Sequence, residues 1–196
     1  MYQWIIKRAL DIIMSGIGIL IAAIPMLLIS LIIKIDSPGP ALFKQKRVGI
    51  NKTFFTILKF RSMPVSVSSD IPTHLLKDDI KLSKWQVFLR KSSADELPQL
   101  FCIFTGKMSF VGPRPALWNQ DDLVEERDIY CANSIRPGLT GWAQINGRDE
   151  LSIVEKAKLD GEYAVAMSKG GTSAFAMDCR CFFGSILPVL QRKNIS

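Results

Sequence analysis

The interpretation of this chain depends most on one segment, Leu89-Arg90-Lys91-Ser92-Ser93-Ala94-Asp95-Glu96-Leu97-Pro98-Gln99-Leu100. Two basic residues lead through two serines to adjacent carboxylates, and a proline follows where only the first turn of a helix tolerates one. From Leu97 the apolar residues Leu100, Phe101 and Phe104 recur with helical spacing, so this helix is expected to bury one face. The segment therefore predicts a helix N-terminus, where free backbone N–H groups and the positive end of the helix dipole lie beside Asp95 and Glu96.

Two interpretations of these carboxylates follow from the residues alone. In the first, Ser93 and Glu96 form a capping box and the acidic side chains only complement the helix dipole. In the second, a carboxylate with a lowered pKa stays ionised and acts as a nucleophile or metal ligand toward a phosphate that Arg90 holds. Other segments of the chain must decide between these two interpretations.

Composition limits the class of protein. The chain has 196 residues, enough for one domain with a sizeable core, and its 25 Lys and Arg against 18 Asp and Glu give a formal charge of +7. This charge favours an anionic partner: a nucleic acid, an anionic lipid or a phosphorylated substrate. Nucleic acid is not expected, because the aromatic residues lie in apolar stripes and are not interleaved with basic ones. The cysteine spacing and the single His74 predict neither a zinc site nor a disulfide framework, and favour the cytoplasm.

The run from Ile12 to Ile33 contains no charged residue and is long enough to cross a bilayer. Pro25 lies near its middle, where a proline removes a backbone hydrogen bond and bends a helix. Both flanks are basic, so positive charge does not favour opposite sides for the two ends. Three structures remain open: a straight span, a helix-break-helix that enters the membrane and returns, and a buried core helix.

Several segments after this run have an expected local structure. Phe54–Arg61 is typical of a short strand or hairpin near a membrane surface, and its basic residues form either a solvated face or a lipid-binding patch. Met63–Thr73 is expected to be a loop. Lys77–Lys91 is expected to be an amphipathic helix, either in the head-group layer or packed on the core. Gln120–Cys131 is expected to be an acidic exposed helix, and Ser152–Met167 a further helix.

Arginines stand in two stiff or glycine-rich loops. Arg114 lies between Pro113 and Pro115, so its guanidinium is preorganised for a phosphate or carboxylate. Arg136 and Arg148 stand toward the two ends of a loop with three glycines, whose backbone can approach a ligand closely. An ordinary pair of turns is the alternative, and the two arginines favour phosphate or nucleotide contact.

Together these segments resemble the monotopic phosphoglycosyl transferases, bacterial sugar transferases that start glycan assembly on polyprenol phosphate. The resemblance runs from Lys7 to about Tyr163. The motifs that carry it, in the order and spacing of the family, are Ser37-Pro38-Gly39-Pro40, Lys59-Phe60-Arg61-Ser62-Met63, Asp95-Glu96-Leu97-Pro98-Gln99-Leu100, Met108-Ser109-Phe110-Val111-Gly112-Pro113-Arg114-Pro115 and Arg136-Pro137-Gly138-Leu139-Thr140-Gly141.

The resemblance implies a role for individual residues. Asp95 matches the aspartate that attacks the β-phosphate of a UDP-sugar, so that UMP leaves and a phosphosugar-aspartyl intermediate forms, which polyprenol phosphate then attacks. Glu96 matches a glutamate that helps to hold Mg²⁺, with Asp95 as the second expected metal ligand. Pro25 matches the break of a re-entrant membrane helix. The expected substrate-binding residues are Lys59, Arg61, Arg90, Arg114, Arg136 and Arg148.

The sequence also departs from the family pattern. Ile24 replaces the serine that is usual before the membrane proline, Gln86 stands where a glycine is common, and Cys102 stands where an asparagine is common. After Tyr163 the likeness fades. These departures leave the predicted chemistry intact and affect the expected sugar and the packing of the C-terminal segment.

The sequence thus predicts an α/β protein, mostly α, on the cytoplasmic face of the bacterial inner membrane. Residues 1–35 are expected to form a re-entrant membrane helix, and residues 36–196 one compact catalytic domain with amphipathic helices against inner-membrane lipids. The expected reaction transfers a sugar-1-phosphate, preferentially of an N-acetylated or modified amino sugar, from a UDP-sugar to undecaprenyl phosphate. The alternatives are a hexose donor or a non-catalytic, basic lipid-binding anchor. Oligomeric state is not predicted.

Overall fold

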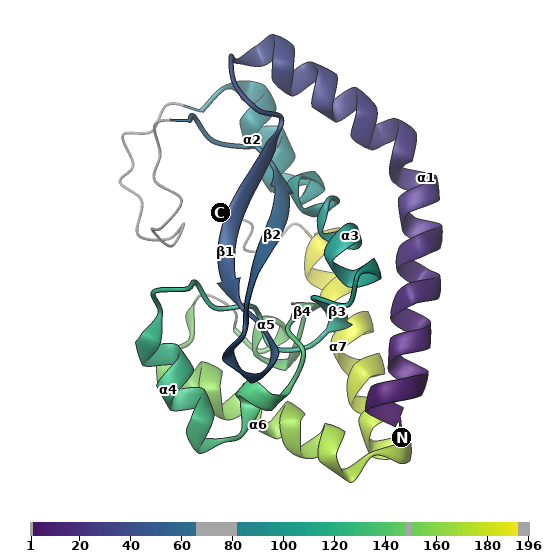
Figure 1. Cartoon of the computed structure of the whole chain (residues 1–196), viewed down its shortest axis with the longest axis vertical. Coiled ribbons are helices and arrows are strands. Elements are labelled where there is room, and N and C mark those ends of the chain that lie inside the picture. The colour runs from purple at the N-terminus through teal and green to yellow at the C-terminus, as the bar shows by residue number, and fades with distance from the viewer. Residues whose placement is uncertain (1, 66–81, 148–149, 192–196) are drawn as a thin grey trace.

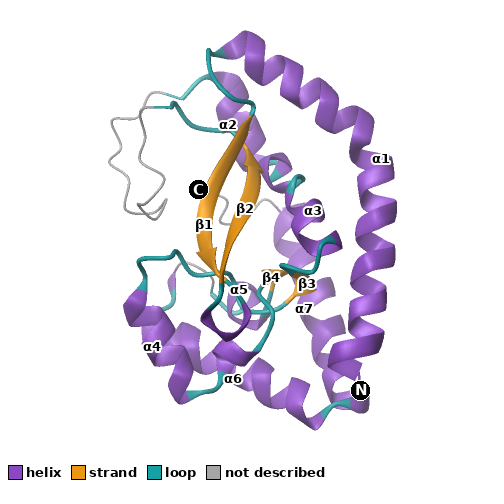
Figure 2. Cartoon of the chain, in the orientation of Figure 1, coloured by secondary structure: helices purple, strands orange, loops and turns teal. Residues whose placement is uncertain are grey.

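The computed structural model describes residues 2–65, 82–147 and 150–191 (Figure 1). Most of this part of the chain is helical, with two small two-stranded sheets (Figure 2). The mostly helical α/β class expected from the sequence is confirmed. The expected loop Met63–Thr73 and the first part of the expected helix Lys77–Lys91 lie largely outside the described residues.

The elements follow one another along the chain as helices and short strands. Their bounds are α1 Lys7–Asp36, β1 Leu42–Val48, β2 Phe54–Phe60, α2 Lys84–Lys91, α3 Gln99–Phe104, β3 Ser109–Val111, α4 Asp121–Ile129, β4 Gly138–Thr140, α5 Trp142–Ile145, α6 Ile153–Lys169 and α7 Gly171–Gln191. A π-helical turn at Tyr2–Ile6 precedes α1, and short 3-10 turns occupy Ile50–Lys52, Ala94–Glu96 and Ala132–Ser134.

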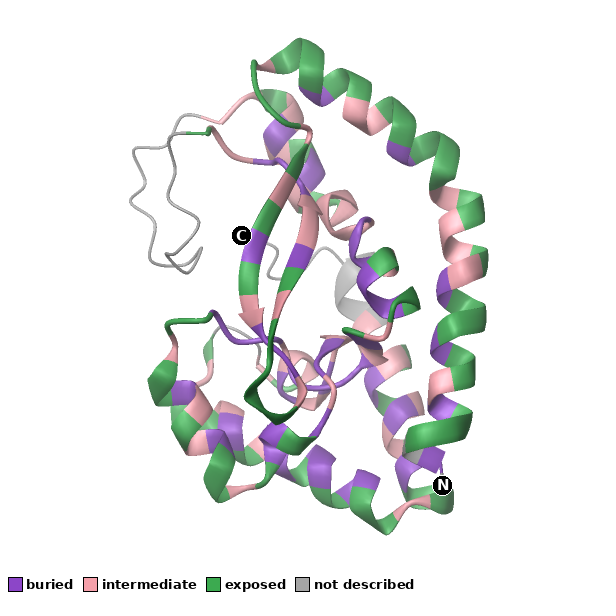
Figure 3. Ribbon diagram, viewed as in Figure 1, coloured by how far each residue is buried: buried purple, intermediate pink, exposed green. Residues whose placement is uncertain are grey.

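Helix α1 is a single helix that continues through Pro25, where the sequence predicted an interruption. Proline removes only its own N–H from the helix ladder, so neighbouring bonds can continue around a bend. Figure 1 shows α1 bent and lying along one side of the molecule. Its outward residues are exposed, Leu20 by 79% and Ile35 by 85% (Figure 3). Within the described ranges, Trp4–Asp36 is the one helical segment apolar and long enough to cross a membrane.

Polar bonds fix the N-terminal end of α1 to the rest of the domain. Lys7 Nζ lies 2.8 Å from Asp178 Oδ2 in α7, in a buried ion pair. Arg8 donates to the carbonyls of Ile103 and Phe104 at the end of α3, both at 2.7 Å. Asp11 accepts from the Phe110 N–H at 3.0 Å and so reaches β3. This end of the apolar helix is therefore held by three separate elements.

The C-terminal end of α1 is fixed by one buried arginine. Arg61, which follows β2, donates from Nη1 to the Pro38 carbonyl at 2.8 Å and from Nη2 to the Ser37 carbonyl at 2.7 Å. Its Nη2 also lies 3.4 Å from the Ile33 carbonyl in the last turn of α1. Carbonyls at a helix C-terminus have no partner within the helix, so a guanidinium there supplies the missing donors.

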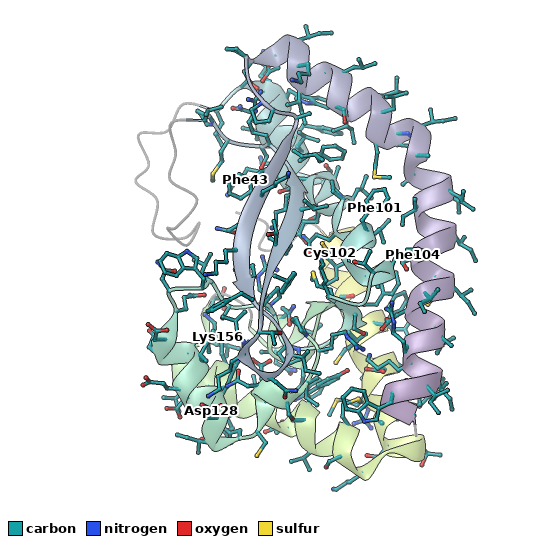
Figure 4. All side chains as sticks on the ribbon, in the orientation of Figure 1. Phe43, Phe101, Cys102, Phe104, Asp128 and Lys156 are labelled. Atoms are coloured by element: carbon teal, nitrogen blue, oxygen red, sulfur yellow. The ribbon has the colours of Figure 1, made fainter. Side chains whose placement is uncertain are left out.

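Strands β1 and β2 form an antiparallel hairpin, paired from Leu42 with Phe60 to Val48 with Phe54. The hairpin that the alternation of Phe54–Arg61 favoured is confirmed. Helix α3 lies between this hairpin and α1. Cys102 packs toward β2, whereas Phe104 lies on the side of α3 that faces α1 (Figure 4).

The buried face of α3 differs from the expected one. The sequence predicted a buried stripe that includes Phe101 and Phe104, and both are exposed, by 42% and 46%. The buried residues of α3 are Gln99, Cys102 and Ile103. Leu100 and Phe104 lie instead toward α1, beside its Gly18 and Gly16.

The remaining helices enclose a hydrophobic core of their own, apart from the hairpin. Strands β3 and β4 pair in parallel, and α5, α6 and α7 pack around them. Helix α6 confirms the expected helix, with Ser152 and Glu155 as a complete capping box. Helix α4 is confirmed as a helix whose acidic residues Asp121, Asp122 and Glu125 are exposed, whereas Leu123 and Arg127 are buried against neighbouring elements.

Candidate active site

The predicted carboxylate pair lies in a 3-10 turn before α3. Ser93 has a left-handed backbone, with φ of 54°, and its side chain caps nothing, so the capping-box interpretation is wrong. Asp95 and Glu96 occupy the 3-10 turn Ala94–Glu96, one turn before α3 begins. Non-glycine residues with positive φ are uncommon and concentrate near functional sites, because the surrounding structure must hold them there.

The Asp95 carboxyl group is half-buried. Burial raises its pKa to about 6; the nearby Lys59 opposes this shift, Glu96 adds to it, and Arg90 opposes it more weakly. The lowered pKa expected from the sequence is therefore wrong in direction, because loss of hydration outweighs the surrounding positive charge. Ser62 Oγ lies 3.4 Å from Asp95 Oδ2 and is the one hydroxyl placed against this carboxylate by a hydrogen bond in the described part of the chain.

Glu96 joins the carboxylate pair to two further elements. Its Oε1 lies 2.7 Å from Nζ of Lys59 in β2 and 3.8 Å from Nη2 of Arg114 in the loop after β3. The Glu96 and Lys59 side chains are 19% and 17% exposed, whereas Arg114 is 40% exposed. Two predicted cations from separate parts of the chain thus meet at one carboxylate.

Arg47 in β1 is a member of this site that the sequence did not single out. Its Nε and Nη2 donate to Gln45 Oε1 at 2.9 and 2.6 Å, and its Nη1 donates to the Pro115 carbonyl at 2.9 Å. Burial, followed by the charge of Arg114, lowers the pKa of Arg47 to about 9, and Glu96 opposes that shift. The sequence does contain one indication of this pairing. Gln45 and Arg47 have i, i+2 spacing, which places both side chains on one face of a strand.

The structure divides the predicted substrate-binding residues into two groups. Lys59, Arg90 and Arg114 surround the carboxylate pair. Arg61 instead holds the end of α1, as described above. Arg136 lies beside Arg8 and Asp11 of α1, and burial, then the charge of Arg8, lowers its pKa. Arg148 lies outside the described residues.

Similar known proteins show the family of this chain. Residues 2–192 match the family described as "Bacterial sugar transferase". The chain belongs to this family. A relative named "UDP-glucose:undecaprenyl-phosphate glucose-1-phosphate transferase" from Escherichia coli (strain K12) is 39% identical over 155 residues, covering 78% of this chain and 33% of the relative. "Exopolysaccharide production protein PSS" from Rhizobium leguminosarum bv. phaseoli is 35% identical, covering 96% of each.

The match covers only part of several relatives. "Undecaprenyl-phosphate glucose phosphotransferase" from Komagataeibacter xylinus is 41% identical over 174 residues, which is 83% of this chain and 32% of the relative. The chain thus spans about a third of the first relatives it matches.

Asp95 and Glu96 are the two candidate ligands for a divalent cation in this sugar transferase. Asp95 and Glu96 are adjacent carboxylates, and the described residues contain no group of three or more His, Cys, Asp or Glu that could hold a metal alone. Mg²⁺ is commonly bound by one or two protein carboxylates together with substrate phosphates and water, whereas zinc requires a fuller protein set. The Asp95–Glu96 pair therefore fits Mg²⁺ that is bound jointly with a phosphorylated substrate. Glu96 would then contact both Mg²⁺ and Lys59.

Proposed function

We propose that this sugar transferase moves a sugar-1-phosphate from a UDP-sugar to undecaprenyl phosphate and releases UMP. The observation that carries the proposal is the half-buried Asp95 carboxylate beside Glu96, with Lys59, Arg90 and Arg114 around the pair. Phosphoryl transfer needs a positioned nucleophile and positive charge spread over the phosphoryl oxygens more than it needs acid–base groups. The names of three relatives, 36% to 41% identical, state such a transfer for glucose.

The proposed course has two steps at one phosphorus. An oxygen of ionised Asp95 bonds to the β-phosphorus of the donor, and the bond to the bridging oxygen breaks, so UMP leaves with that oxygen. A phosphate oxygen of the polyprenol then bonds to the same phosphorus, and the bond to Asp95 breaks. The second step restores the carboxylate and completes a ping-pong cycle.

The cations have separate places in this proposal. We assign the donor's diphosphate to Arg114, because it is the more exposed of the two cations on Glu96, and the orientation of Glu96 to Lys59. Mg²⁺, held by Glu96 with Asp95 and the donor, would neutralise charge on the diphosphate. Arg90 contributes positive charge near the nucleophile.

The proposed donor is a hexose, glucose in the first instance. The amino sugar that the sequence favoured has no support among the relatives' names, whereas the hexose alternative matches several of them. The departures at Gln86 and Cys102 do not bear on this choice directly, since Gln86 belongs to the capping box of α2 and Cys102 packs against β2.

We also propose the membrane arrangement expected from the sequence, with α1 dipping into the inner membrane and returning to the cytoplasmic face. Both ends of α1 are bonded to one polar domain, through Lys7 and Arg8 at one end and Arg61 at the other. A straight span would have to break one of these sets. Residues 1–35 would then form the membrane segment and residues 36–196 the catalytic domain.

UMP release tests the function. The purified protein in detergent is given Mg²⁺, undecaprenyl phosphate and a panel of UDP-hexoses and UDP-amino sugars, beside Asp95→Asn and the surface control Asp128→Asn. We expect release with UDP-glucose, loss of release in Asp95→Asn and no change in Asp128→Asn. Silence of the folded protein across the panel, with retained binding to anionic vesicles, would favour the membrane-anchor alternative.

A further inference from the structure

Two arginines from different elements hold consecutive carbonyls of the loop that carries Arg114. Arg47 Nη1 in β1 donates to the Pro115 carbonyl at 2.9 Å, and Arg127 Nη2 in α4 donates to the Arg114 carbonyl at 2.9 Å. The Val48 N–H adds a bond of 2.9 Å to the Ala116 carbonyl. Three successive residues of the loop are thus fixed through their backbone, while the Arg114 side chain remains 40% exposed toward the site.

Arg127 is itself held by a buried carboxylate. Its Nε and Nη2 donate to Asp160 Oδ2 of α6 at 2.9 and 2.6 Å, and the two side chains are only 7% and 1% exposed. Asp160 Oδ1 has no hydrogen-bond partner among the described residues, so the bonds of this carboxylate there go to Arg127. The guanidinium therefore spans from α6 to the Arg114 loop with a fixed orientation.

This geometry uses properties that are particular to arginine. A guanidinium presents several donors in one rigid plane, so a single side chain can bond a carboxylate and a carbonyl at the same time. A buried ion pair is a weak source of stability compared with apolar side chains of similar volume. A role in orienting the loop explains why this ion pair is buried and why Arg127 also bonds the Arg114 carbonyl. A gain in stability explains neither.

We propose that Arg127 and Asp160 form a positioning pair that sets the Arg114 guanidinium beside Glu96 and against the donor's diphosphate. The inference rests on the proposed function, because it assigns the diphosphate to Arg114. Neither Arg127 nor Asp160 touches the substrate; both act through the loop backbone. The competing explanation is that the pair only fastens α4 to α6.

The first variant is Arg127→Lys, which keeps the charge next to Asp160. One ammonium group does not span both Asp160 and the Arg114 carbonyl in the same geometry, so the loop loses its bond. We expect kcat/KM to fall by about a hundredfold, the order of loss that a misplacement near 1 Å produces. The melting temperature of this variant is measured in parallel.

A double-mutant cycle with Arg114→Gln separates positioning from fastening. If Arg127 acts through Arg114, then Arg127→Lys costs little more once Arg114 is gone, and the two losses in kcat/KM are far from additive. If Arg127 only joins α4 to α6, the losses are additive and the inference is overturned. Asp128→Asn is the matched control, since Asp128 lies on the same helix in an exposed ion pair with Lys52.

A second variant guards against loss of the fold. Arg127→Met combined with Asp160→Leu removes both charges and the bond to the loop, and an apolar pair of this kind is commonly tolerated in a core. We expect this variant to keep the melting temperature within a few degrees while kcat/KM falls as in Arg127→Lys. Retained kcat/KM in the folded double variant would overturn the inference.

UDP binding distinguishes failure of this inference from failure of the proposed function. The affinity for UDP is measured by calorimetry for the same variants, because a contact between Arg114 and the diphosphate does not require turnover. Wild-type protein that binds UDP with a non-additive cycle but releases no UMP would refute the proposed function and keep the positioning pair. The positioning pair would be refuted if the wild-type protein turns over while substitutions at Arg114 and Arg127 leave the affinity for UDP unchanged.

Discussion

The Asp95 carboxyl group combines two demands that oppose one another. A nucleophile must be ionised, yet burial raises the pKa of this group to about 6. Desolvation leaves the ionised form more reactive, and nearby cations keep that form populated at neutral pH. The acidity of this one residue therefore sets the pH range in which the proposed reaction proceeds.

We expect kcat/KM to fall on the acid side of about pH 6. The active form of Asp95 is the deprotonated one, which is dominant above its pKa of about 6 and is lost as the pH falls through that value. Below this point the rate should drop about tenfold per pH unit. A pH profile of UMP release between pH 4.5 and 8 measures the limb. A flat profile down to pH 5 would contradict the account.

Lys59 provides an internal check on that limb. Its charge lowers the pKa of Asp95, so Lys59→Met should move the acid limb to higher pH, in addition to any loss in rate. Lys52→Met is the matched control, because Lys52 forms only an exposed ion pair with Asp128. A limb that stays in place in Lys59→Met would mean that this cation does not act on the nucleophile.

Sequence reasoning found the site residues whose role depends on local motif and missed those whose role depends on burial. Asp95, Glu96 and Arg114 stand in distinctive segments, and the structure brings them together. Arg47 and Arg127 carry no local mark, since a basic residue in a polar strand or helix is normally solvated. Their function arises only when β1 and α4 meet the loop after β3.

Helix α3 and its preceding turn depend on a close contact with α1. A Cβ on Gly18 would lie 3.3 Å from Leu100 Cδ1, whereas one on Gly16 would lie 3.5 Å from Phe104, an ordinary contact. Gly18 thus lets the two helices approach at Leu100. Because Leu100 lies in α3, directly after the turn that holds Asp95, the contact also supports the site.

Gly18→Leu should separate α1 from α3. We expect a destabilisation of about 1–3 kcal/mol, as overpacking of a close contact usually costs, and a lower melting temperature in detergent. Gly16→Ala is the control: its methyl group fits, and alanine is the better helix former, so the melting temperature should hold or rise. Equal behaviour of the two variants would show that the contact between α1 and α3 is not tight.

Element types were more predictable than element boundaries. The hairpin β1–β2 and helix α6 lie where the sequence predicts a strand or hairpin and a helix. The turn before α3 does not, because Ser93 takes a left-handed backbone that its sequence context gives no reason to expect. Helix α2 begins at Lys84, where Ser83 and Gln86 cap it, later than the amphipathic pattern indicated.

The molecule as a whole is a polar domain with one apolar helix fastened to it at both ends. Four polar groups from the N-terminal segment, α6 and α7 meet at the first fastening: Tyr2, Lys7 and Tyr163 all bond Asp178. No role for Asp178 is predicted from the sequence, since it lies where the family likeness fades. Contacts between residues so distant along the chain arise only from the folded arrangement.

Both ends of α1 should face the cytoplasm. Trp4→Cys and Lys34→Cys, each in a background of Cys131→Ser and Cys179→Ser, place one thiol at an exposed position near either end. In intact cells a membrane-impermeant maleimide should label neither, and after lysis it should label both. A third protein that carries only Cys179→Ser keeps natural Cys131, which is exposed on the catalytic domain and reports the side of that domain. Labelling of only one end in intact cells would establish a straight span.

The most direct test of the central claim is mass spectrometry of the protein mixed with UDP-glucose and Mg²⁺ in the absence of polyprenol phosphate. The account predicts a hexose-phosphate adduct on Asp95, formed together with an equal amount of UMP and discharged when undecaprenyl phosphate is added. Asp95→Asn should show neither adduct nor UMP. Turnover that needs both substrates at once, without an adduct and with activity retained in Asp95→Asn, would contradict it.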